Sequence, residues 1–146
     1  MDYFAIGEDK SLKNLNDIES WEKLWENPNP TSNFEAQTIQ LSDLLYVNDE
    51  IAIEYEILGK TSSYHVSYFI MHDGYKNNVH LNWSQVTNLE LQVATRLCEI
   101  IISTGKINVL DSILCSVKPS GTKIETQYKP YCAPLAIYRR TTKQFN

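Results

Sequence analysis

The residues best suited to chemistry lie in two neighbouring segments near the middle of the chain. The segment EIAIEYEIL (50–58) contains Glu54 and Glu56, and the segment SYHVSYFIMHDGYKNNVHLNW (63–83) contains every histidine of the chain. These histidines are His65, His72 and His80. Imidazole and carboxylate groups on one surface could hold Zn²⁺ or a similar metal, or carry out acid–base chemistry. The same groups could instead contact a partner.

Strand patterns decide whether these side chains share a surface. Residues 50–58 alternate strictly, which places Glu54 and Glu56 on one face of a strand and the isoleucines on the other. Asp73-Gly74 is typical of a two-residue hairpin turn. Such a turn would pair the strands on either side of it and direct His65 and His80 to the glutamate face. His72 lies at the turn, where we expect it to be solvated.

Two helices are expected to flank this three-stranded meander. Asn16 and Glu19 resemble a capping box, and they predict a short amphipathic helix over 16–27. Thr87 and Glu90 form a second box before an apolar run, which predicts a buried helix over 87–104 that ends at Gly105. We expect this second helix to cover the apolar face of the meander.

The remaining patterns complete a single domain over 1–146. DSILCSVK and TKIETQY flank the turn Pro-Ser-Gly and predict a hairpin, and PLAIYRR predicts a last strand. The fold class expected from these elements is α+β, with an antiparallel sheet, a long buried helix and a short N-terminal helix.

Composition narrows the classes of function. No apolar run reaches the roughly 18–20 residues of a membrane span, and the first residues lack the pattern of a secretory signal. The three cysteines match no metal motif, so we expect free thiols and a cytoplasmic protein without a metal or cofactor. The net charge is −5, but residues 1–60 contain 13 acids and four bases, whereas residues 61–146 contain five acids and nine bases. This asymmetry suggests a charged partner.

The chain resembles small α+β bacterial immunity proteins, which neutralise toxins that are often nucleases. The resemblance is carried by the segment IESWEKLWE, by the strands after it, by a buried helix ending in STG, and by a terminal hairpin. It implies a non-catalytic protein that covers a toxin's active site or a neighbouring surface.

We therefore predict a non-catalytic binding protein that blocks a basic protein partner through an acidic face. The glutamates would pair with lysine or arginine, and the histidines would form hydrogen bonds that depend on pH. The residues expected to contact the partner are Glu50, Glu54, Glu56, His65, His80 and, as an aromatic anchor, Trp25.

Three other functions fit parts of the pattern. One is a small metal-dependent or acid–base hydrolase that uses His65, His80 and Glu54 or Glu56. Another is a phage-encoded inhibitor of host defence, which would have similar size and acidity. The third is a single-stranded nucleic-acid binder, although a pI near 5.1 argues against it. Its contacts would be Lys118, Lys123, Lys129, Arg139, Arg140 and Lys143, interleaved with Tyr128, Tyr131 and Tyr138.

Overall fold

The computed structural model describes residues 21–57, 63–70, 77–127 and 129–141, and within them the chain forms ten strands and no helix. All strand pairs are antiparallel. In chain order the strands are β1 (Glu22–Glu26), β2 (Gln37–Gln40), β3 (Asp49–Glu56), β4 (Ser63–Phe69), β5 (Asn77–Val86), β6 (Leu91–Ile101), β7 (Lys106–Val109), β8 (Ile113–Val117), β9 (Lys123–Gln127) and β10 (Ala133–Thr141).

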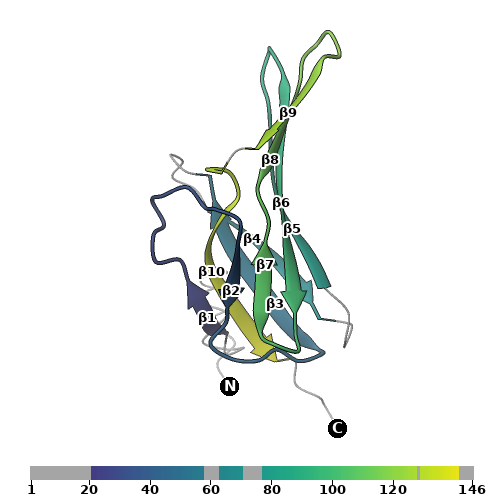
Figure 1. Cartoon of the computed structure of the whole chain (residues 1–146). Helices are drawn as coiled ribbons and strands as arrows, with labels where there is room; N and C mark the ends of the chain where they lie inside the picture. Colours follow the sequence, from purple (N-terminus) through teal and green to yellow (C-terminus); the bar gives the residue numbers. More distant parts are fainter. Residues whose placement is uncertain (1–20, 58–62, 71–76, 128, 142–146) are drawn as a thin grey trace, which may run out of the picture.

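Two sheets divide these strands. Sheet A has the order β1-β10-β3-β4, and sheet B has the order β2-β7-β6-β8-β9, with β5 paired to the other side of β6. In the lower part of Figure 1 the two sheets overlap and form a layered body. Above it, β8, β9 and the hairpin that joins β5 to β6 extend beyond sheet A. We call residues 82–95 and 113–127 the arm, and the two-sheet part the body.

The core of the body lies between the sheets. Sheet A contributes alternate residues of β3, such as Ile51 and Ile53, and sheet B contributes Leu81, Ile100 and Ile107, all with at most 1% of their surface exposed. Burial of each such side chain is worth roughly 1.5–3 kcal/mol. The strict alternation in β3 therefore fixes its register, because a shift by one residue would bury its glutamates.

The expectation of an α+β fold is wrong, because the predicted helix over 87–104 is a strand and a turn. Residues 91–101 form β6, whose burial alternates with period two. The Thr87 hydroxyl does accept hydrogen bonds from the backbone of Leu89 and Glu90, as a helix cap would. However, the Thr87 N–H donates to the Glu90 carbonyl at 2.9 Å, which closes a hairpin turn between β5 and β6. The α+β architecture on which the resemblance to immunity proteins depended is therefore not found.

The N-terminal helix predicted over 16–27 is also wrong where the structure describes it. Residues 16–20 lie outside the described part, and residues 22–26 form β1, which pairs with β10. The register shifts between Lys23 and Trp25, as in a β-bulge. This irregularity lets two consecutive residues, Leu24 and Trp25, both contact the core, and that spacing imitates a helical face.

The predicted hairpin between the strands of His65 and His80 is wrong as well. Asp73-Gly74 lies outside the described residues, and β4 and β5 belong to different sheets. Three other predictions are confirmed, namely the alternating strand around Glu54, the hairpin of β8 and β9, and the final strand β10. Gly121, in the Pro-Ser-Gly turn, has a φ of 91°, which glycine adopts without steric cost.

A buried arginine marks the junction of body and arm. Arg96, in the middle of β6, has none of its surface exposed. Its guanidinium donates hydrogen bonds to the carbonyls of Cys132 at 2.9 Å, Leu110 at 2.8 Å, and Lys129 at 3.0 Å. Burial lowers the pKa of Arg96. The side chain thus ties β6 to the β7–β8 connection within sheet B and to the segment between β9 and β10, which leads from sheet B to sheet A.

The described residues contain no helix of the length and hydropathy that crossing a membrane requires.

Candidate partner-binding surfaces

The acidic face, which we define as Glu54, Glu56 and His65, lies on the outer surface of sheet A. Glu54 and Glu56 project outward from β3, and His65 lies directly opposite Glu54 on β4. The His65 Nε2 atom is 3.9 Å from the Glu54 carboxylate, which also accepts a hydrogen bond from the Ser63 hydroxyl at 3.2 Å. Strand pairing therefore brings these three predicted site residues together.

Within the described part of the chain, no lysine or arginine is paired with the two glutamates of this face, Glu54 and Glu56. Partial burial, and then the charge of Glu54, raise the pKa of Glu56. The neighbouring Lys23 is held by Glu26 at 2.8 Å. An incoming cation would relieve the repulsion between the two carboxylates.

Glu50 lies on the same outer surface but is already engaged. Its carboxylate accepts a hydrogen bond from Arg140 Nε at 2.7 Å, and only 8% of the residue is exposed. The Arg140 guanidinium also lies over the ring of Trp21, 4.7 Å from its centroid. Glu50 therefore acts within the sheet, and contact with a partner would first have to break this pair.

His80 and Trp25 lie away from the acidic face. His80 projects from β5 on the outer surface of sheet B, opposite Leu97 of β6. Trp25 is partly buried and packs edge-on against Phe34, with ring centroids 6.2 Å apart. The structure thus separates His65 from His80, which the sequence placed together.

This separation excludes a site that would use both histidines at once. His65 and His80 extend from the outer surfaces of different sheets, so they cannot bind one ion together. Within the described ranges, no three side chains of the metal-binding types come together in one group. Ser67 lies on the His65 face, two positions along β4.

The basic residues near the C-terminus are mostly paired within the chain. Arg139 is 2.6 Å from Glu22 and 2.9 Å from Asp43, and Lys129 is 2.6 Å from Glu35. Lys143 and Tyr128 lie outside the described residues. Lys123 lies on β9 of sheet B, whereas Arg139 and Arg140 lie on β10 of sheet A, so these cations do not form one continuous stripe in the described part of the chain.

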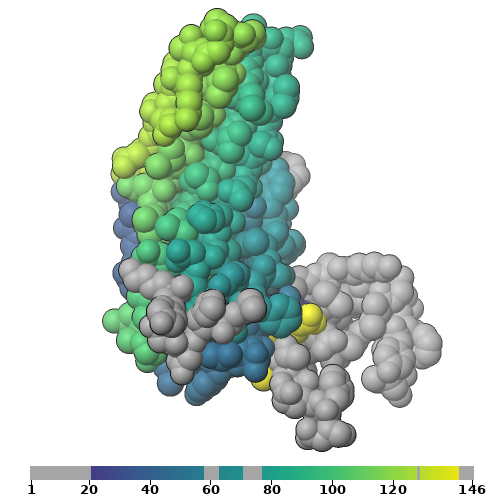
Figure 2. Space-filling view, turned by 90° about the vertical axis from the view of Figure 1, so that its right-hand side faces the viewer, coloured from purple at the N-terminus to yellow at the C-terminus, as the bar shows by residue number. Residues whose placement is uncertain are grey.

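The arm carries a surface that the helical prediction for 87–104 concealed. Its exposed apolar residues cluster near the hairpin tip and on one side of the arm sheet, where Val86 pairs with Leu91 and Val93 pairs with Cys115. Val86 and Leu89 are 78% and 76% exposed. We call this set the arm patch; it consists of Val86, Leu89, Leu91, Val93 and Ile113. In Figure 2 the β5–β6 and β8–β9 segments of the arm form the upper part of the molecule.

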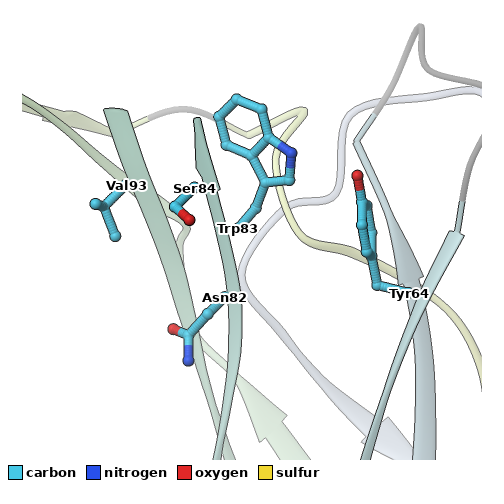
Figure 3. Close-up of a pocket in the computed structure, with 5 residues that line it drawn as sticks. All are labelled: Tyr64, Asn82, Trp83, Ser84 and Val93. Atoms are coloured by element: carbon cyan, nitrogen blue, oxygen red, sulfur yellow. The ribbon is translucent and has the colours of Figure 1, made fainter. Parts of the chain in front are cut away.

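An aromatic hollow lies at the base of the arm, between the edges of the two sheets. Figure 3 shows Trp83 of β5 and Tyr64 of β4 facing the gap between their strands, while Asn82 and Ser84 point to the other side of β5. Trp83 packs edge-on against Tyr131, with ring centroids 4.9 Å apart. Two aromatic side chains, Tyr64 and Trp83, therefore contribute to the lining of this hollow.

Comparison with known proteins finds no matching family model, no matching curated protein and no matching solved structure.

Proposed function

We propose that this chain is a non-catalytic binding protein that docks its acidic face on a basic protein partner and blocks that partner, as immunity proteins do with toxins. The observation that carries the proposal is the pair of glutamates at positions 54 and 56. Their side chains lie two positions apart on the outer surface of sheet A, and neither pairs with a lysine or arginine among the described residues.

The surroundings of these carboxylates suit recognition of lysine or arginine. A β-sheet fixes the backbone positions of its outward side chains, so a partner that binds them does not have to order the backbone. Charges arranged in this way accelerate association and select partners of opposite charge. Tyr138 of β10, which pairs with Ala52 and shares the outer face with Glu54, supplies an aromatic surface near the charges. The cytoplasmic location expected from the sequence belongs to this proposal, and three free thiols support it.

A photo-crosslinking experiment tests the docking face. A benzophenone amino acid is placed at Ser67, on the outer surface of sheet A, or at Asn78, on the outer surface of sheet B. Both variants are expressed in the native host and irradiated. We expect Ser67 to yield one dominant adduct with a basic protein, and Asn78 to yield none of that protein.

The captured protein is then purified and titrated against matched variants. Glu54→Gln with Glu56→Gln removes two negative charges from the acidic face. Asn78→Lys with His80→Lys adds the same total charge to the outer surface of sheet B. We expect the first pair to weaken binding at least about tenfold and the second to change it little. Equal effects of the two pairs, or an adduct at Asn78 alone, would contradict the proposal.

A further inference from the structure

Strand β9 is an uncovered edge of the arm. It is the last strand of sheet B, and among the described residues it pairs only with β8. All five of its residues are exposed. An edge of this kind presents unpaired backbone N–H and C=O groups that can accept another strand.

The turn before β9 determines which of its backbone groups are free. The N–H of Lys118 donates to the carbonyl of Thr122 at 2.9 Å, so these two residues form a hydrogen-bonded pair. Pairs alternate along an antiparallel ladder, and β8 and β9 pair without a register shift. Ile124 therefore directs its backbone groups to β8, whereas Lys123 and Glu125 direct theirs to the free edge.

The charges of β9 are complementary to those of a second, antiparallel copy of the same strand. Lys123 and Glu125 lie on one face of the strand, with their charged groups 3.1 Å apart and their side chains 60% and 55% exposed. If two β9 strands meet around a twofold axis at Ile124, Lys123 of each copy faces Glu125 of the other. Ile124, which is 45% exposed, then faces its own copy.

This register also satisfies the backbone. Lys123 and Glu125 of the two copies would form hydrogen-bonded pairs through the groups that the first copy leaves free. Ile124 would form a non-hydrogen-bonded pair, in which side chains lie closest together. A register centred on Lys123 or Glu125 would instead set like charges opposite each other, which is destabilising.

We infer that β9 is a self-association strand through which two copies of this chain join their arms into one continuous antiparallel sheet, in the register centred on Ile124. Lysine at a strand edge usually opposes such pairing. Here Glu125 lies two positions after Lys123, so in the dimer each Lys123 would pair with Glu125 of the other copy. This inference is independent of the acidic face on sheet A.

Charge reversal tests the register in the full chain. Lys123→Glu alone, or Glu125→Lys alone, sets like charges opposite each other twice in every dimer. We expect each to weaken self-association, measured by analytical ultracentrifugation, by about tenfold or more. The double variant Lys123→Glu with Glu125→Lys restores both opposite-charge pairs and should recover wild-type dimerisation.

A disulfide experiment tests the same register directly. In a Cys115→Ser background, Ile124→Cys should form a covalent dimer under mild oxidation, because the two thiols would face each other. Thr126→Cys is the matched control on the same face of β9. Its two copies would lie roughly 13 Å apart in this register, beyond the reach of a disulfide.

Two results would overturn the inference. One is a wild-type chain that sediments as a monomer throughout the micromolar range. The other is Thr126→Cys crosslinking as fast as Ile124→Cys. Circular dichroism of each variant verifies that the sheet content of the chain is unchanged.

Discussion

The body and the arm share strands β5 and β6 but differ in what covers them. In the body, sheet A covers one face of these strands, and Leu81 and Ile100 are completely buried. In the arm, sheet B continues beyond sheet A, and Ile124, on the same face of sheet B as Leu81, is 45% exposed. A single sheet layer without a second layer has little apolar burial to stabilise it. We conclude that the body holds most of the buried apolar core, whereas the arm is a single sheet layer with apolar side chains exposed on it.

The largest expected effect is a core truncation compared with its counterpart in the arm. Ile53→Ala removes a side chain that is 1% exposed, and we expect it to lower the free energy of unfolding by about 2–5 kcal/mol. Val93→Ala, at a position that is 37% exposed, should lower it by less than about 1 kcal/mol. Urea denaturation measures both, and similar losses would contradict the division into body and arm.

The junction between the two regions is expected to be nearly as sensitive. Arg96→Met keeps much of the side-chain volume but leaves the carbonyls of Cys132, Leu110 and Lys129 without their donor. Buried carbonyls without partners cost about 1–3 kcal/mol each, so we expect a loss of about 3 kcal/mol or more. Lys106→Met, at an exposed position of β7, is the control and should change stability by about 0.5 kcal/mol or less.

Two glycines with positive φ allow a further comparison. Gly105 in the body has a φ of 65°, and an added Cβ would lie 3.0 Å from the Asp43 carbonyl oxygen. Gly121 in the arm has a φ of 91° and open space around it. Substitution by alanine strains the backbone at both sites, by about 1–3 kcal/mol. Because only Gly105→Ala also meets a close atom, its melting temperature should fall further than that of Gly121→Ala.

The smallest effect concerns pH. Hydrogen bonding to Arg139 lowers the pKa of the Asp43 carboxyl. A lowered pKa stabilises the folded chain above the ordinary aspartate pKa near about 4, and this contribution disappears as pH falls through the folded value. Asp43→Asn should therefore be less stable than the wild type at neutral pH. The difference should shrink in acid.

Urea midpoints at neutral pH and below pH ~3 measure this effect. Glu90→Gln, in the arm, is the control, because Glu90 has no cationic partner among the described residues. A difference between wild type and Asp43→Asn that stays constant with pH would contradict the role of the Arg139 contact.

The sequence correctly predicted those elements whose local pattern is compatible with only one type of secondary structure. Strict alternation around Ile53 fixed β3 and the outward direction of Glu54 and Glu56, and alternation in β4 placed His65 beside them. The Pro-Ser-Gly turn fixed the hairpin of β8 and β9. In each of these cases, the periodicity of two and the turn residues point to the same structure.

The sequence-based predictions were wrong where one local pattern is compatible with two structures. A threonine hydroxyl that accepts from the following N–H groups occurs at helix starts and in turns alike, and at Thr87 the turn prevailed. Val93, Thr95, Ile100 and Ile101 are β-branched and favour a strand. However, β6 is covered only along part of its length, so its apolar residues fall on both faces and resemble a helical stripe. His80 was misplaced because the chain passes from one sheet to the other after β4.

The continuity of β6 through both regions has a mechanical consequence. The strand is paired with β5 from Leu91 to Ile100, with β8 toward the tip and with β7 toward the base. Because β5 and β6 both continue from the arm into the body, a force that pulls the arm along β6 is carried by these two backbones and does not open their hydrogen bonds one after another. A partner held at the tip could therefore transmit tension into the body without first peeling the arm from it.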